Sequence, residues 1–189
     1  MKKRKAERTK EKIIRAFYKL NREPDRPLST VPEICEELDI AVSTFYCYYT
    51  GINDLISQES EKLKEFWEKS LEHDKFEILM AAKEEPFPRE MVSRILQGYL
   101  QKKEEHLVLM REDLNLPIRR TLYQFIREIT SILAKLYPKV MREYATQFVA
   151  EGSLPIILTY LKRDDMSVEA FSELLYSLGN AVFRIGYNY

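Results

Sequence analysis

TVPEICEELDIAVSTFYCYY, residues 30–49, is the stretch from which the fold of this chain is predicted. Thr30 and Glu33 have the spacing of a capping box, in which the hydroxyl accepts from a first-turn N–H and the carboxylate accepts from the cap's own N–H. Pro32 falls in the first helical turn, where a missing N–H leaves no hydrogen bond unmade. The stretch therefore predicts two short helices joined by a tight turn.

The two predicted helices each have one apolar side. Ile34 and Leu38 lie one turn apart, while Ile40, Phe45 and Tyr49 supply apolar partners beyond the turn, with Ile40 filling the angle between the helices. The remaining side chains of the second helix should face outward, where they suit hydrogen bonding to phosphates and base edges. They are Val42, Ser43, Thr44, Tyr46, Cys47 and Tyr48.

The order of Ile34, Ile40, Thr44-Phe45-Tyr46, Tyr49 and Leu55 resembles the helix-turn-helix of the tetracycline-repressor (TetR/AcrR) family of transcription regulators. The resemblance implies an all-α fold, with a three-helix DNA-binding domain over residues 1–56 and a helical effector-binding and dimerisation bundle over 57–189. It implies a transcriptional repressor. The DNA contacts that we expect are Lys3 and Arg4 in the basic N-terminal segment, together with Thr30, Val42, Ser43, Thr44, Tyr46, Cys47 and Tyr48.

Four positions depart from the family pattern. Cys35 replaces a small Ala, Asp39 replaces the turn Gly, Ala41 replaces the usual Ser cap, and Ile52 replaces a Lys. The family resemblance implies a phosphate contact at the last position, and an isoleucine cannot make it. These changes affect the DNA contact more than the fold.

Charge is balanced overall but uneven along the chain. The formal net charge is zero, from 30 basic and 30 acidic residues. Residues 1–15 nevertheless carry eight basic groups against two acids. This basic arm is either a phosphate or minor-groove contact or a disordered solubilising terminus.

The central stretch lacks cations. Residues 28–61 contain no Lys or Arg and seven acids. Because duplex affinity comes largely from neutralised phosphates, a reader of DNA would depend on the basic arm, on hydroxyls and on backbone N–H groups. Two interpretations stay open: a dimeric, ligand-responsive regulator, or a TetR-fold co-regulator that has lost DNA affinity and acts through protein contacts.

The rest of the chain has the apolar spacing of helices throughout. We predict helices over 8–21, 53–72, 76–83, 90–103 (extending toward residue 110), 118–137 and 138–162, and a last helix opened by Ser167. Gly152 and Pro155 should kink or split the helix that contains them. We found no internal repeat.

Residues 147–162 and 166–175 resemble the C-terminal region of a TetR subgroup, where the last two helices pair with those of a second subunit. We therefore expect a homodimer formed by helices near 140–162 and 167–186, bound to a palindromic duplex operator with half-sites about 34 Å apart. An unidentified small-molecule effector would release it. Aromatic residues that either line the effector cavity or form ordinary core are Phe66, Trp67, Tyr99, Tyr123 and Phe125.

Signatures of catalysis are missing from the sequence. His73 and His106 are isolated, and the Glu104–His106 segment is expected on a solvated helix face. We expect no enzyme activity, no cofactor and no metal. Two cysteines, with no signal peptide and no membrane-length apolar run, suggest a soluble cytoplasmic protein.

Overall fold

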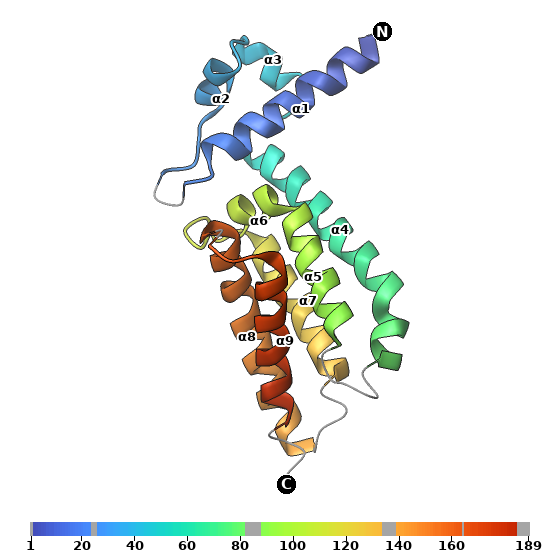
Figure 1. Ribbon diagram of the computed structural model, residues 1–189. Helices are drawn as coiled ribbons and strands as arrows, with labels where there is room; N and C mark the ends of the chain where they lie inside the picture. The colour runs from blue at the N-terminus through green and yellow to red at the C-terminus, as the bar shows by residue number, and fades with distance from the viewer. Residues whose placement is uncertain (1, 24–25, 82–87, 134–138, 164, 185–189) are drawn as a thin grey trace. The chain divides into compact units, whose positions relative to one another are not determined.

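The computed structural model describes residues 2–23, 26–81, 88–133, 139–163 and 165–184. Every regular element in these ranges is a helix, which confirms the predicted all-α class (Figure 1). The helices are α1 Lys2–Leu20, α2 Val31–Glu37, α3 Val42–Tyr46, α4 Ile52–Ala81, α5 Arg89–Gln101, α6 Lys103–Leu109, α7 Pro117–Leu133, α8 Lys139–Arg163 and α9 Val168–Arg184.

The chain divides into two compact units. The first combines Met1–Leu63 with Glu104–Ile118, and the second combines Lys64–Lys103 with Arg119–Tyr189. The sequence had suggested a single boundary after residue 56, with no sign that a later segment returns to the first unit.

In the first unit α1 packs against α2, and α2 packs against α3. Burying apolar side chains is what holds such short helices in place, because helices of five to seven residues are not stable alone. The core side chains of this unit include Ile13, Phe17, Ile34, Phe45, Tyr49, Leu55 and Leu63, each at most 2% exposed.

The segment that returns to the first unit is deeply buried. His106, Leu107, Val108 and Leu109 are all buried, and His106 is 0% exposed. The expectation that His106 lies on a solvated face is therefore wrong. Two acids precede it, but the apolar run that follows it decides its environment.

A buried arginine then secures this segment. The Arg111 guanidinium donates hydrogen bonds to the backbone carbonyls of Asn21, Glu23 and Arg26. It also forms a bidentate pair with the carboxylate of Asp113. The planar fork of arginine suits such an array of acceptors.

In the second unit α5 packs against both α8 and α9, which pack against each other. The core comprises Met91, Val92, Leu96, Tyr99, Leu122, Ala150, Leu154, Ile157, Tyr160, Leu161 and Phe171. Gly98 permits a close approach to Trp67, since a Cβ atom there would lie 2.9 Å from the indole Cη2.

Several helix boundaries differ from the predictions. The first helix begins at Lys2 rather than residue 8, so the basic arm is helical backbone. α4 continues from Ile52 to Ala81, because no Gly or Pro interrupts the polar residues near 73–75 that suggested a break. α8 continues through Pro155, where a kink or split was expected.

Among the described residues, no helix combines the length and the apolar character that crossing a bilayer demands.

Candidate functional site

The α2–turn–α3 segment is held at both ends of α2. Thr30 caps the helix: its hydroxyl accepts from the Glu33 N–H at 3.4 Å, and its own N–H donates to the Glu33 carboxylate at 2.7 Å. The hydrogen bond from the Thr30 N–H is the largest cause that lowers the pKa of the Glu33 carboxyl below its ordinary value; the Thr30 hydroxyl and Arg26 are lesser causes.

The turn after α2 is a Schellman motif. Asp39 has a φ of 51°, in the left-handed region, where the family pattern carries glycine. The N–H of Asp39 donates to the Glu36 carbonyl and the N–H of Ile40 to the Cys35 carbonyl. Aspartate adopts this conformation more readily than most residues do, so the departure from glycine is tolerated.

α3 starts without a side-chain cap. Ala41 is its N-cap and makes no side-chain hydrogen bond, as its methyl group requires. The helix is instead anchored by Phe45 and Tyr49, at 0% and 2% exposure, whose rings lie 5.6 Å apart. Because Phe45 and Tyr49 are buried on one side, the other side of α3 is exposed to solvent.

The residues predicted to face outward do so to different extents. Tyr46 is 55% exposed and Val42 41% exposed, and Ser43 and Cys47 are also exposed. Thr44 and Tyr48 are half-buried. None of the six is buried, so the whole predicted face can be reached by another molecule.

Most of the hydroxyl groups on this face have no hydrogen-bond partner among the described residues. The hydroxyls of Ser43, Thr44, Tyr46 and Tyr48 make no hydrogen bond with the described residues. Thr30 differs from them, since its hydroxyl proton is already donated to Glu33 at 2.8 Å. The Cys47 thiol donates to the Ser43 carbonyl.

The basic residues of the N-terminal segment lie on α1 rather than on a separate arm. The side chains of Lys3 and Arg4 lie outside the part that the structure describes, although their backbone is helical. Arg8, Lys12 and Arg15 are exposed and make no ion pair within the described ranges. Their i, i+4, i+7 spacing places them on one face of α1. These three residues were not among the predicted DNA contacts, although the charge count of the first fifteen residues pointed to them.

Other cations nearby are already paired. Lys19 pairs with Glu37 at 2.5 Å, and Arg26 pairs with Glu33 at 3.1 Å. Lys10 donates to Gln58. These pairs neutralise two of the seven acids that made the central stretch appear unfavourable to DNA.

Two further acids of that stretch also have internal partners. Asp54 accepts from the Thr50 N–H at 2.8 Å, which is the main reason that its pKa is lowered. Glu59 is 5% exposed, accepts from the Tyr18 hydroxyl and pairs with Lys62 at 2.6 Å. At least four of the seven acids of residues 28–61 thus have hydrogen-bond or ion-pair partners within the first unit.

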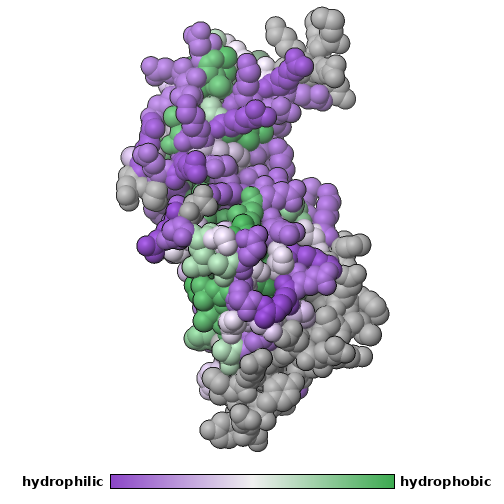
Figure 2. Space-filling model, in the orientation of Figure 1, coloured by the Kyte–Doolittle hydropathy of each residue, from purple (hydrophilic) through white to green (hydrophobic). Residues whose placement is uncertain are grey.

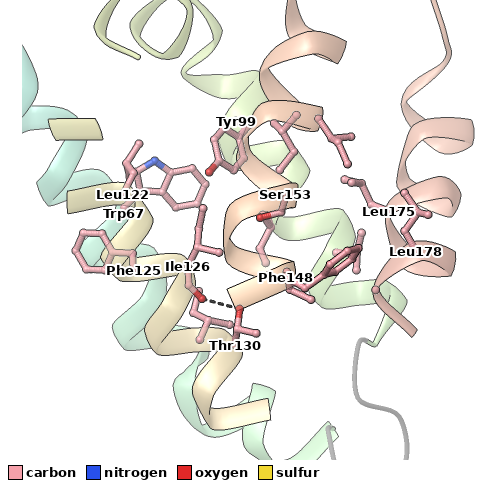
Figure 3. Close-up of a pocket in the computed structure, with 18 of the residues that line it drawn as sticks. Trp67, Tyr99, Leu122, Phe125, Ile126, Thr130, Phe148, Ser153, Leu175 and Leu178 are labelled. Atoms are coloured by element: carbon pink, nitrogen blue, oxygen red, sulfur yellow. Dashed lines mark hydrogen bonds between the residues drawn. The ribbon is translucent and has the colours of Figure 1, made fainter. Parts of the chain in front are cut away.

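The second unit contains a cavity of about 430 Å³ (Figure 3). Helices α4, α5, α7, α8 and α9 all contribute to its lining. The residues that line it are Trp67, Val92, Ile95, Tyr99, Leu122, Phe125, Ile126, Ile129, Thr130, Phe148, Val149, Gly152, Ser153, Ile156, Ile157, Leu175, Leu178, Gly179 and Ala181.

Of the five aromatic residues predicted for an effector cavity, three line it. Trp67, Tyr99 and Phe125 belong to the lining, and the first two rings lie 4.8 Å apart. Phe66 lies beside Trp67 in an edge-to-face arrangement, and the Tyr123 ring lies beneath the Arg119 guanidinium. Neither of these two lines the cavity.

Sequence reasoning missed the contribution of α8 and α9 to the cavity. Gly152 was interpreted as a kink and Ser153 was not singled out, whereas both line the cavity. A glycine inside a helix carries a penalty of about 1 kcal/mol relative to alanine, so its presence in mid-helix was the signal that could have drawn attention to this wall.

An exposed apolar face accompanies the cavity on α8 and α9. Tyr144 is 74% and Phe148 67% exposed on α8, and Leu174 and Leu178 are 39% and 44% exposed on α9. Hydrophobic residues gather over this part of the second unit in Figure 2. Large exposed apolar clusters commonly mark protein–protein contacts.

The described residues contain no group of His, Cys, Asp and Glu side chains that is arranged to hold a metal ion. Cys35 is buried, and this burial raises the pKa of its thiol.

Comparison of the chain with protein-family models, with curated protein sequences and with solved structures gave no match.

Proposed function

We propose that this protein is a dimeric, DNA-binding transcriptional regulator of the TetR type, with α2 and α3 forming a helix-turn-helix. In this proposal α3 enters the major groove, and the chain acts as a repressor that a small molecule releases from a palindromic operator. The observation that carries the proposal is the outward face of α3, where the hydroxyls of Ser43, Thr44 and Tyr46 have no hydrogen-bond partner among the described residues, and the opposite side is anchored by Phe45 and by Tyr49, which follows the helix.

The hydroxyls of this face supply specificity in the proposal. Ser43, Thr44 and Tyr46 can each donate to a phosphate or hydrogen-bond to a base edge. Phosphate contacts fix the register of a protein on duplex DNA, and contacts to base edges read the sequence.

The electrostatic attraction comes from α1 in this proposal. Arg8, Lys12 and Arg15 form a row of cations that no acid of the described residues neutralises. Affinity for duplex DNA depends on such charges through the release of counterions. The lack of cations on α3 is then compatible with DNA binding.

Dimerisation would bring two such α3 helices to successive turns of one duplex face, about 34 Å apart. The exposed apolar face of α8 and α9 is the surface we assign to the partner subunit, consistent with the isologous contacts of twofold dimers. A Tyr144→Asp variant should therefore sediment as a monomer at micromolar concentration while keeping its helical circular dichroism. A wild-type monomer at that concentration would contradict this assignment.

The second candidate is a co-regulator of the same fold that acts through protein contacts and has little DNA affinity. The observation that favours it is Ile52, which begins α4 where the family resemblance implies a lysine on a phosphate.

Selection of DNA sites from a random duplex library, followed by affinity measurements over a series of salt concentrations, separates the two candidates. A regulator should select a palindrome, and log K should fall steeply with log salt. Replacing Arg8, Lys12 and Arg15 by Gln should reduce that slope by about 0.9 for each phosphate that is no longer neutralised.

Lys162→Gln is the matched control for this experiment, because it removes an exposed cation at the end of α8 in the second unit. Its slope should equal that of the wild type. Absence of any selected site, or equal slopes for all variants, would contradict the regulator proposal and favour the co-regulator.

A further inference from the structure

The cavity of the second unit has no charged side chain in its lining. The residues that surround it are aliphatic or aromatic, apart from two small hydroxyl side chains and two glycines. An ionised group placed there would lose its hydration without gaining a counter-charge, which is strongly unfavourable. The lining therefore disfavours carboxylates, phosphates and ammonium groups that are placed among these apolar side chains.

One hydroxyl in the cavity has unused hydrogen-bonding capacity. Ser153 Oγ is buried and has no hydrogen-bond partner among the described residues. Figure 3 shows Ser153 on α8, between the side chains of α7 and the leucines of α9. The Thr130 hydroxyl, by contrast, donates to the Ile126 carbonyl at 2.7 Å. The Ser153 hydroxyl can thus both donate to a ligand and accept from it.

The volume limits the size of the ligand. A cavity of about 430 Å³ lies near the lower end of the range of about 300–1,000 Å³ that is typical of small-molecule sites. The Trp67 and Tyr99 rings form part of the wall and suit contact with an alkyl chain or a flat ring.

From these observations we propose that the cavity binds a neutral, largely apolar molecule with a single hydroxyl or carbonyl group, and that Ser153 recognises this group. The role of this cavity as an effector site rests on the proposed function, whereas binding of the neutral ligand can be measured without DNA. A buried hydroxyl without a partner is unfavourable, and pairing it with a ligand group removes that penalty.

The chain offers a direct readout, because Trp67 is the only tryptophan in the sequence and lines the cavity. Its fluorescence should be titrated in the full-length protein, without DNA, against 1-decanol, 2-decanone, decanoate and decylammonium. These probes share a chain length and differ in the head group. The alcohol and the ketone should bind, and both ions should bind at least tenfold more weakly. Equal affinity for decanoate and decanol would overturn the proposal.

Ser153→Ala tests the hydrogen bond. It should weaken 1-decanol binding about fivefold, as expected for one neutral hydrogen bond, and leave binding of 1-chlorodecane unchanged. An equal loss for both probes would overturn the role of Ser153. Thr159→Ala is the matched control on the same helix, since that exposed hydroxyl bonds to the Pro155 carbonyl outside the cavity.

Gly152→Leu tests whether the probes bind in the cavity. A Cβ atom at Gly152 has no neighbour within 4 Å, so a leucine there should occupy the cavity and abolish binding of every probe. Unchanged binding would place the probes elsewhere and overturn the proposal. If this variant fails to fold, as judged by circular dichroism, the head-group series on the wild type still decides.

The two proposals fail separately. Decanol binding without selection of any DNA site would contradict the regulator function and leave the cavity chemistry standing. DNA binding by a protein that shows no preference for the neutral probes would contradict the cavity proposal and leave the regulator function standing.

Discussion

Arg111 Nη1 donates a hydrogen bond to the backbone carbonyl of Asn21 at 3.2 Å, although ninety residues separate the two in sequence. Asn21 is itself fully buried, and its side chain donates to the Phe17 carbonyl and to the Ser29 hydroxyl, both at 2.7 Å. The end of α1, the loop that follows it and the segment after α6 therefore share one buried polar network.

Arg111→Met should destabilise the first unit by about 3 kcal/mol, because it removes the guanidinium that donates to the buried Asn21 carbonyl and to the part-buried Glu23 and Arg26 carbonyls. Urea unfolding followed by far-ultraviolet circular dichroism measures this loss. Arg163→Met is the control, since Arg163 forms an exposed pair with Asp165; it should change stability by less than about 0.5 kcal/mol. Equal losses for the two variants would mean that the network contributes nothing specific.

Thr30→Ala should cost about 1 kcal/mol at neutral pH, because it removes the N-cap hydroxyl of α2. Thr30→Ser, which keeps the hydroxyl, should stay close to the wild type. The measurement is the urea midpoint of each variant. A Thr30→Ala midpoint equal to that of the wild type would show that the first turn of α2 is held by other contacts.

Glu33→Gln tests the charged half of the same capping box. The folded-state pKa of Glu33 is lowered, so its ionised form contributes stability above its ordinary pKa, near 4, and that contribution is lost as the pH falls through the folded value. The gap in stability between the wild type and Glu33→Gln should therefore be present at pH 7 and shrink below about pH 4. A gap that is constant from neutral to acidic pH would contradict this origin.

Tyr18→Phe tests a buried hydrogen bond of the first unit, in which the Tyr18 hydroxyl donates to Glu59 at 3.2 Å. Desolvation by burial is the largest cause that raises the Tyr18 pKa, and the Glu59 charge adds to it. The folded state then keeps its proton while the unfolded state ionises near pH 10, so stability falls as the pH rises above about 10. Tyr18→Phe should lose stability less steeply there, by up to about 1.4 kcal/mol per pH unit. Parallel alkaline curves for the two proteins would contradict the assignment.

Two glycine-to-alanine variants in the second unit should change the stability of the protein in opposite directions. Gly98→Ala places a Cβ atom 2.9 Å from the Trp67 ring, so overpacking should outweigh the gain in helix propensity and cost about 1 kcal/mol. Gly152→Ala meets nothing within 4 Å and should stabilise the protein by about 0.5–1 kcal/mol. Thermal unfolding and Trp67 fluorescence report both effects. The same sign for the two variants would contradict the packing described for Trp67.

Local patterns predicted the α2–turn–α3 segment well, because its signals act over three or four residues. The capping box at Thr30 and the buried positions of Phe45 and Tyr49 follow from spacing alone. None of these features needs information from distant parts of the chain.

Features set by distant contacts could not be predicted in the same way. The burial of His106 depends on which unit its segment joins, and no local pattern encodes that choice. The partners of Arg111 are three backbone carbonyls about ninety residues away, and carbonyls carry no sequence signature. The cavity likewise needs five helices at once, so its aromatic residues were foreseen only in part.

Pro155 lies inside α8, two residues after Ser153, and has no N–H to offer the Glu151 carbonyl. One backbone hydrogen bond of α8 is therefore missing beside the cavity. Bending α8 at that turn breaks one backbone hydrogen bond fewer than bending it elsewhere. Within α8, a bend at this turn is thus the change in backbone that would widen the cavity at the smallest loss of helical hydrogen bonds.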